Sequence, residues 1–285
     1  MKDWPADAHV HSEYSWDTGG PASPSAAGTM ARTCARAVRI GLPAVIFTEH
    51  LDPSCWMAAP EDFAEHERHL IDPDGLMRPP PFDADGYLES IERCRHAFPD
   101  LHILTGVELG QPHLDRPAAE AQIDLSLLDR VNGSLHTLQF RGHRSEPVTL
   151  FRELADPAEV IWAYLAEVRH LVDLGDFDVL THIDYAARSW PVEEHGPFDH
   201  TRFEDGFRQA MRALAASGRA LEMNTGRPLR PWIPQWWAEE GGRAVSFGSD
   251  DHATDGLAAN FPEAVALLDH VGFAPGRRPE DFWTR

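Results

Sequence analysis

The sequence predicts an α/β fold: a closed barrel of seven parallel strands with helices between them. Short apolar runs alternate with helical patterns, as in repeated βα units, and 285 residues suffice for one large domain of this kind. Each of the seven runs ends in a residue that can bind a metal or a substrate. In a barrel all strand ends meet at one mouth, whereas an open doubly wound sheet gathers only some of them. We therefore expect a single domain over residues 1–285, with its site at the C-terminal ends of the strands.

Strands and helices are expected in alternation. A strand near residues 6–11 precedes a helix that starts at Ser23-Pro24-Ser25, covers 26–40 and stops at Gly41, because Ser favours helix starts and Gly helix ends. The other expected strands cover 44–50, 101–107, 130–136, 177–182, 219–224 and 243–252. The other expected helices cover 83–98, about 118–128, 157–174, 203–217, 232–240 and 262–271. The irregular stretches 51–82 and 138–154 leave room for an eighth short strand.

Composition restricts location and partners. Apolar residues make up 42% and charged residues 25% of the chain, ordinary values for a globular protein. No apolar run can span a bilayer and the N-terminus lacks a signal-peptide core, so we expect a cytoplasmic protein without a membrane partner. A net charge of −21 repels a phosphate backbone, so we expect no nucleic-acid partner. The sequence does not indicate an oligomeric state.

Two histidines on the first expected strand form half of a metal site. Successive strand side chains point to opposite faces, so His9 and His11 share one face, and Asp17 follows within one loop length. A chance His-x-His is the alternative in a chain with 16 histidines. Donors at later strand ends favour the metal site and bring the candidate ligands to nine: His9, His11, Asp17, His50, Glu108, His136, His182, Asp250 and His252.

The type and number of these donors indicate a metal cluster. Imidazoles and carboxylates suit Zn, Fe or Mn, and the identity of the metal stays open. Nine ligands exceed one tetrahedral zinc site and suit two or three divalent ions with bridging carboxylates. Such clusters hold a phosphoryl group, activate water and stabilise the leaving oxygen. Their positive charge also permits a small phosphorylated substrate in an acidic protein.

Several motifs follow one another in a characteristic order: Asp7-x-His9-x-His11, Thr48-Glu49-His50, Gly106-Val107-Glu108, Gly133-Ser134-Leu135-His136, Thr181-His182-Ile183-Asp184 and Gly248-Ser249-Asp250-Asp251-His252. This order resembles the PHP family, named after polymerase and histidinol phosphatase, over about residues 6–273. The run Ala220-Leu221-Glu222-Met223-Asn224-Thr225-Gly226 resembles the histidinol-phosphatase branch, whose members carry a similar Leu-Glu-x-Asn-Thr segment. Thr48-Glu49-His50 also fits that branch.

The resemblance implies a distorted (β/α)7 TIM-like barrel with a trinuclear site. One metal would take His9, His11, Glu108 and Asp250. A second would share Glu108 and take His136 and His182, and the third would take Asp17, His50 and His252. Many relatives carry a Cys-Pro-His-like segment where this chain has Tyr14-Ser15-Trp16-Asp17, so Glu13 is a rival to Asp17 as a ligand.

The resemblance also implies a metal-dependent phosphomonoesterase of histidine biosynthesis that hydrolyses L-histidinol phosphate to histidinol and phosphate. A metal-activated hydroxide would attack phosphorus in line, with Glu108, Asp250 and His252 as catalytic residues. One alternative is another small phosphoester or a cyclic phosphate as substrate. A nuclease or proofreading module, which predicts a basic groove, and a non-catalytic binding protein, which predicts eroded ligands, are the others.

Phosphate recognition in an acidic protein should also require fixed cations. Arginine has a planar fork that matches phosphate geometry. Arg188 and Arg227 follow the ends of the fifth and sixth expected strands and Asn224 ends the sixth, so we expect these three residues to bind the substrate. The alternative is that either arginine pairs on the surface with Glu193, Glu194 or Asp199, which would make Arg141 and Arg144 the next candidates.

Overall fold

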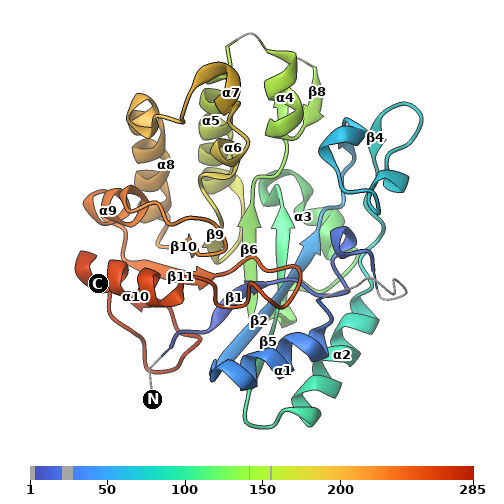
Figure 1. Cartoon of the computed structure of the whole chain (residues 1–285), viewed down its shortest axis with the longest axis vertical. Coiled ribbons are helices and arrows are strands. Elements are labelled where there is room, and N and C mark those ends of the chain that lie inside the picture. Colours follow the sequence, from blue (N-terminus) through green and yellow to red (C-terminus); the bar gives the residue numbers. More distant parts are fainter. Residues whose placement is uncertain (1–3, 21–27, 141, 155) are drawn as a thin grey trace.

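A computed structural model describes residues 4–20, 28–140, 142–154 and 156–285. Its main sheet has the strand order β1-β2-β5-β6-β9-β10-β11-β12 and curls into a half-barrel (Figure 1). The first seven strands run parallel, and the last is antiparallel to its neighbour. Their bounds are β1 (Asp7–Val10), β2 (Ala44–Leu51), β5 (His102–Gly110), β6 (Arg130–Ser134), β9 (Val179–Leu180), β10 (Ala220–Asn224), β11 (Ala244–Gly248) and β12 (Trp283–Thr284).

The seven parallel strands lie in the seven expected runs, and the prediction of an α/β fold is confirmed. The eighth strand of this sheet, β12, comes from the C-terminus and not from either irregular stretch. Those stretches contribute to a second sheet of order β4-β3-β8-β7, which lies with α4 over the carboxyl ends of the main strands (Figure 1). Its strands are β3 (Trp56–Met57), β4 (Leu76–Met77), β7 (Leu138–Phe140) and β8 (His143–Ser145).

Backbone hydrogen bonds link β1 to the segment that follows β11. The N–H of Asp250 donates to the carbonyl of His9 over 2.7 Å, and the N–H of His11 donates to the carbonyl of Asp251 over 2.9 Å. The first strand of the chain therefore lies beside its last parallel strand. This contact brings the donors of the first and last motifs together.

The helices flank the sheet at about the expected positions (Figure 1). α1 (Met30–Ile40) begins after Thr29, whose hydroxyl accepts from the N–H of Arg32, and ends at Gly41 with φ 74°. The helix start expected at Ser23-Pro24-Ser25 lies outside the described residues. The helix expected near 118–128 lies earlier, as α3. The other bounds are α2 (Ala84–Ala97), α3 (Pro112–Glu120), α4 (Pro147–Glu153), α5 (Ala158–Leu174), α6 (Tyr185–Arg188), α7 (Val192–His195), α8 (Glu204–Ser217), α9 (Trp232–Glu239) and α10 (Phe261–Val271).

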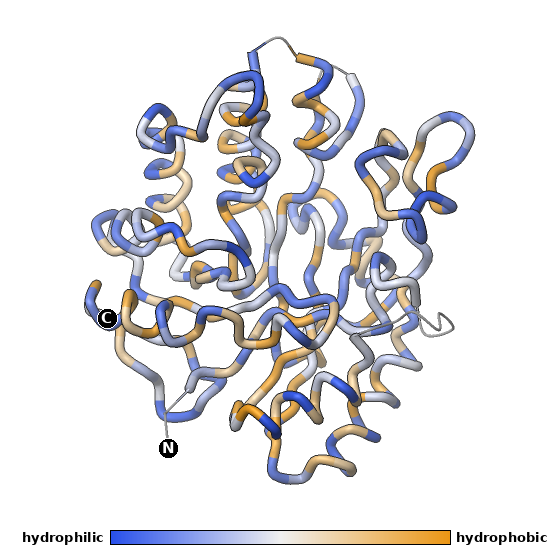
Figure 2. The backbone as a smooth tube through the Cα atoms, in the orientation of Figure 1, coloured by the Kyte–Doolittle hydropathy of each residue, from blue (hydrophilic) through white to orange (hydrophobic). Residues whose placement is uncertain are grey.

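Strand β5 serves both the core and the site. Val107 and Leu109 are buried in the main apolar core, while Glu108 between them points to the opposite face. The hydroxyl of Tyr87 bonds the backbone of both Phe47 and Gly106, which ties β2 to β5. Figure 2 shows hydrophobic and hydrophilic residues alternating along the helices. None of the described helices is both long and apolar enough to cross a membrane.

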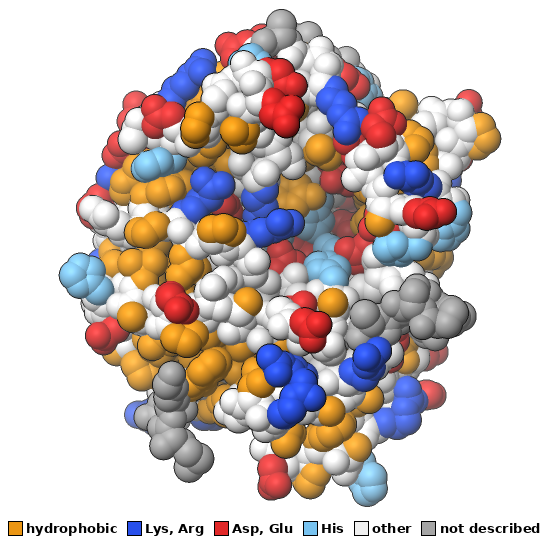
Figure 3. Space-filling view, viewed as in Figure 1, with side chains coloured by type: hydrophobic (Ala, Val, Ile, Leu, Met, Phe, Trp, Pro, Cys, Tyr) orange, Lys and Arg blue, Asp and Glu red, His pale blue; other side chains and the backbone are white. Residues whose placement is uncertain are grey.

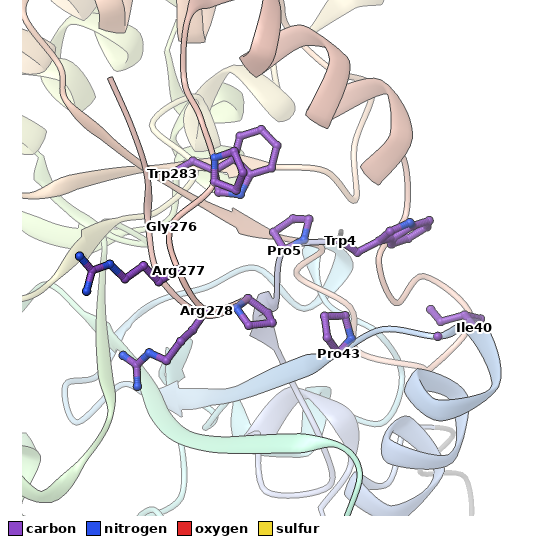
Figure 4. A pocket seen from close by; sticks show the side chains of 11 residues that line it. Trp4, Pro5, Ile40, Pro43, Gly276, Arg277, Arg278 and Trp283 are labelled. Atoms are coloured by element: carbon purple, nitrogen blue, oxygen red, sulfur yellow. The ribbon is translucent and has the colours of Figure 1, made fainter. Parts of the chain in front are cut away.

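A hollow at the amino ends of the strands is apolar and lacks the predicted donors. Figure 4 shows Trp4, Pro5, Pro43 and Trp283 around it. Pro5 and Pro43 closely precede β1 and β2, so this hollow lies at the end of the sheet opposite the predicted ligands. Its described lining includes arginines but no His, Asp or Glu. The candidate site is therefore at the carboxyl ends, where barrel-like α/β folds carry their active sites.

Candidate metal centre

Glu108, near the carboxyl end of β5, lies at the centre of a buried cluster. Its Oε1 atom lies 3.1 Å from Nε2 of His136 and 2.8 Å from Nε2 of His182. Its Oε2 atom lies 3.2 Å from Nε2 of His9 and 3.0 Å from Nδ1 of His50. This single carboxylate is fully buried and contacts imidazoles from four different strand ends.

The four donors predicted for the first metal lie together. The Nε2 atoms of His9 and His11 are 3.1 Å apart, and Oδ1 of Asp250 lies 3.5 Å from both. With Glu108, these donor atoms all lie within 4.8 Å of one another. Asp250 has φ 57°, in the left-handed region that Asp tolerates better than most residues. Imidazole nitrogens that face each other beside two carboxylates suit a cation between them.

The donors predicted for the second metal also converge, with one unexpected neighbour. Glu108, His136 and His182 offer donor atoms within 4.8 Å of one another. Asp52, which the sequence analysis missed, is buried with Oδ1 3.3 Å from Nδ1 of His136 and Oδ2 3.6 Å from Nδ1 of His50. This carboxylate contacts the nitrogen of His136 that faces away from Glu108.

The third predicted position is formed by Asp17 and two histidines. The Nε2 atoms of His50 and His252 are 3.3 Å apart, and Oδ2 of Asp17 lies 3.2 Å and 2.9 Å from them. Glu13, the rival of Asp17, instead accepts a hydrogen bond from the N–H of Met30 at the start of α1. Of the two carboxylates, it is therefore Asp17 that the structure brings to the histidines.

Glu222 on β10 supports His9 from behind and was also missed as a site residue. Its Oε1 lies 2.5 Å from Nδ1 of His9, and its Oε2 accepts from the N–H of His182 and the amide of Asn224. Gly248 permits this approach, because a Cβ there would collide with both Glu222 and His9. A carboxylate on the remote nitrogen of a metal-binding imidazole fixes its tautomer and raises its basicity.

Strand alternation could have identified both missed carboxylates. Asp52 stands two residues after His50, and Glu222 stands two residues before Asn224. Side chains two positions apart share a strand face, so each carboxylate is expected beside its predicted partner.

All nine predicted ligands thus lie around one hollow, eight of them at or just after strand ends and Asp17 in a turn that follows β1. Figure 3 shows histidine and acidic side chains gathered at its bottom, with basic side chains beside its edge. The three residues predicted as catalytic, Glu108, Asp250 and His252, belong to this group. The structure therefore brings together the whole predicted ligand set.

In the metal-free protein, burial and mutual contact shift the pKa values of the cluster. Burial favours protonation of Glu108, yet the imidazoles around it hold its pKa well below the usual range. Burial disfavours protonation of His136, but Glu108 and Asp52 raise its pKa to about 10. Burial also disfavours protonation of His252, but the carboxylate of Asp17 outweighs burial and raises the pKa of His252 to about 9. Protons therefore occupy part of the ligand set at neutral pH.

The donor set fits divalent cations. Among the described residues, Oε2 of Glu108, Nδ1 of His50 and Oδ1 of Asp17 are buried without a hydrogen bond of good geometry, although the first two lie 3.0 Å apart. Buried polar atoms are costly when unpaired, and here they lie where the predicted ligands converge. Ions bound among these atoms would satisfy them.

Metal binding should therefore release protons. His136 and His252 have raised pKa values, so both imidazoles carry protons at pH 7.5 and must lose them to bind a cation. Apparent metal affinity should rise with pH and level off above about pH 10. Titration calorimetry of zinc into chelated protein, in buffers of different ionisation enthalpy, counts the protons released. A His136→Asn variant should release fewer, and a heat independent of the buffer would contradict the prediction.

Arg188, at the end of α6, lies beside the cluster. Its Nη1 is 3.2 Å from Oδ2 of Asp250, and its Nε is 3.7 Å from Oδ1 of Asp184. Surface pairing with Glu193, Glu194 or Asp199 is therefore wrong for this residue. Nε and Nη2 of the guanidinium are buried without a hydrogen-bond partner among the described residues, so two donors of Arg188 stay available.

The other candidate phosphate binders are placed differently. The amide of Asn224 donates to Oδ2 of Asp250 over 3.2 Å, which holds that carboxylate instead of leaving the amide free. Arg227 lines the same small hollow as Arg188 and Asn224, but it is exposed. Arg144 pairs with Asp115 over 2.8 Å, and Arg141 lies outside the described residues.

Comparisons with known proteins agree with this architecture. The model of the PHP domain family matches residues 7–226. A Clostridium acetobutylicum protein named "Probable histidinol-phosphatase" is 26% identical over 203 residues, 68% of this chain and 76% of the relative. A Thermotoga maritima protein of the same name is 27% identical over 130 residues, 43% of this chain and 53% of the relative. The crystal structure of histidinol phosphate phosphatase from Lactococcus lactis, complexed with zinc, L-histidinol and phosphate, superposes with a TM-score of 0.67 at 21% identity and covers 95% of this chain and 94% of that one.

Proposed function

This chain belongs to the PHP domain family, and from that premise we propose that it is a metal-dependent phosphomonoesterase that hydrolyses L-histidinol phosphate to histidinol and phosphate. The observation that carries the proposal is the buried carboxylate of Glu108 with four imidazoles within 3.2 Å. The two curated relatives named "Probable histidinol-phosphatase" support the substrate.

The nine predicted ligands would hold two or three divalent ions. Zinc is present in the Lactococcus lactis enzyme, while Fe and Mn suit the same donor types. Ions in such a site lower the pKa of bound water and neutralise phosphoryl oxygens. Glu222 and Asp52 would orient His9 and His136 from their remote nitrogens. Arg188 would donate its free N–H groups to a phosphoryl oxygen, and Asn224 would hold Asp250 in place.

We extend the proposal to the setting of the enzyme. The link between β1 and the segment after β11 supports a distorted (β/α)7 barrel that uses the whole chain as one domain. We further propose that the enzyme acts in histidine biosynthesis, because histidinol is the product of the proposed reaction, and that it acts in the cytoplasm. Its partner would be a small phosphorylated substrate.

A phosphate-release assay tests the function. Chelated protein reloaded with Zn, Fe or Mn should hydrolyse L-histidinol phosphate with a kcat/KM at least about 100-fold above that for glycerol phosphate or phosphoserine, because polar pockets discriminate strongly against substrates lacking matched groups. Equal rates on all three would leave a phosphatase but reject this substrate. Cleavage confined to single-stranded DNA would favour a nuclease, and cleavage confined to a cyclic nucleotide would favour the cyclic-phosphate alternative.

A further inference from the structure

A second carboxylate, partly buried, lies near the candidate metal centre. Glu146 precedes α4, but its side chain does not cap that helix. Instead, its Oε1 accepts a hydrogen bond from the indole N–H of Trp56 over 3.1 Å, and its Oε2 accepts from the hydroxyl of Tyr185 over 3.2 Å. Residues from β3, α6 and the start of α4 therefore hold one carboxylate in a defined position.

The carboxylate has no basic partner among the described residues. Their ion pairs do not include Glu146, although a buried carboxylate is costly unless a cation or several donors compensate it. Burial raises the pKa of Glu146 to about 7, and the nearby charge of His136 opposes this only in part. Each carboxylate oxygen has one hydrogen bond and can accept another. The residue is partly exposed, so a ligand can reach it.

Glu146 is one aromatic side chain away from the metal ligands. The hydroxyl of Tyr185 binds Glu146, and the ring centroid of Tyr185 lies 5.3 Å from that of His136 and 5.2 Å from that of His182. The ring centroid of Trp56, the other partner of Glu146, lies 5.9 Å from that of Trp16. A carboxylate held between two aromatic side chains favours a bound organic cation, since its negative charge attracts one and the indole N–H and the hydroxyl fix its position.

We propose that Glu146, held by Trp56 and Tyr185, binds a cationic group of the substrate and selects phosphomonoesters whose alcohol carries an ammonium or imidazolium group. The inference rests on the proposed function and deepens it. With the phosphoryl group at the nine ligands, the alcohol of L-histidinol phosphate extends its amine and imidazole a few bonds away. A cation there donates hydrogen bonds to the acceptor sites of Glu146 that Trp56 and Tyr185 leave unfilled. A neutral alcohol leaves the partly buried carboxylate without a compensating charge.

Matched substrates test the proposal. The alcohol part of L-histidinol phosphate carries cationic groups, while 3-phenylpropyl phosphate is a phosphomonoester of similar size whose alcohol part is uncharged. The ratio of their kcat/KM values should fall at least about tenfold in Glu146→Gln, mainly through KM, because charge-assisted hydrogen bonds are lost. Glu153→Gln is the matched control: it removes an exposed carboxylate at the other end of α4, which pairs with His143, and should keep the wild-type ratio. A purely structural role of Glu146 would lower both rates equally and overturn the proposal.

A binding measurement separates this inference from the proposed function. L-histidinol should bind the zinc-loaded wild-type protein at least about tenfold more tightly than Glu146→Gln by titration calorimetry. If the wild type fails to hydrolyse L-histidinol phosphate but shows this difference, the proposed function fails and the cation site stands. If hydrolysis is confirmed but neither binding nor the substrate ratio changes in Glu146→Gln, the function stands and the cation site is wrong.

Discussion

Glu108→Ala should lose most of its bound metal and reduce kcat/KM by at least about 1,000-fold. The reason is that one carboxylate contacts His9, His50, His136 and His182, so its loss removes the negative charge shared by two predicted metal positions. Loss of a group that merely supports a ligand costs about 10- to 100-fold, and loss of a shared ligand should cost more. Metal analysis of the purified variant, together with phosphate release, measures both effects.

A control that contacts the same strand outside the cluster separates this effect from destabilisation. Asp129 bonds the N–H and hydroxyl of Thr105 in β5, nearer the amino end of that strand. Asp129→Ala should lower stability without lowering the metal content. If Glu108→Ala keeps two or more ions and wild-type activity, the assignment of the centre is wrong.

Arg188→Ala should lower kcat/KM by about 30-fold, or about 2 kcal/mol, while the fold and the metal content persist. Its guanidinium lies next to Asp250 and has buried N–H groups without hydrogen-bond partners among the described residues, so it can donate to a phosphoryl oxygen. A charge-assisted hydrogen bond to phosphate is worth about this amount. Steady-state kinetics on the zinc-loaded variant gives the change.

Two further variants make the result specific. Arg188→Lys keeps the charge but lacks the planar fork, so it should recover only part of the lost rate. Arg227→Ala should have a smaller effect than Arg188→Ala, because Arg227 is exposed and its side chain is not held beside the cluster. If both alanine variants keep wild-type kcat/KM, other residues bind the phosphate.

Strand pattern alone was enough to predict the parallel strands and most of the donor side chains that gather at their ends. A strand signal is local, because apolar runs and their flanking turn residues lie within a few positions of one another. The polar residue that ends each run, such as His50 or His182, therefore lies at the carboxyl end of its strand. Parallel strands place all such ends on one side of the sheet, so the candidate ligands from His9 to His252 could be grouped before their contacts were known.

Only the tertiary structure decided which of several plausible side chains reach the centre. Glu13 and Asp17 are four residues apart, yet the turn between them directs one to α1 and the other to His50. Arg188 and Arg227 both follow strand ends, but of the two it is Arg188 that contacts Asp250.

Glu146 is the clearest case of a residue beyond the reach of sequence patterns. It stands in an irregular stretch with no periodic signal, and its two partners are 90 and 39 positions away. The second sheet was missed for the same reason, because its strands have only two or three residues and gain their pairing from segments far apart in the chain. The sequence determined by itself the order of the strands and the chemistry at their ends, since both depend on neighbours along the chain. The partners of Glu146, and the selection among rival donors, depend on long-range packing that local patterns do not encode.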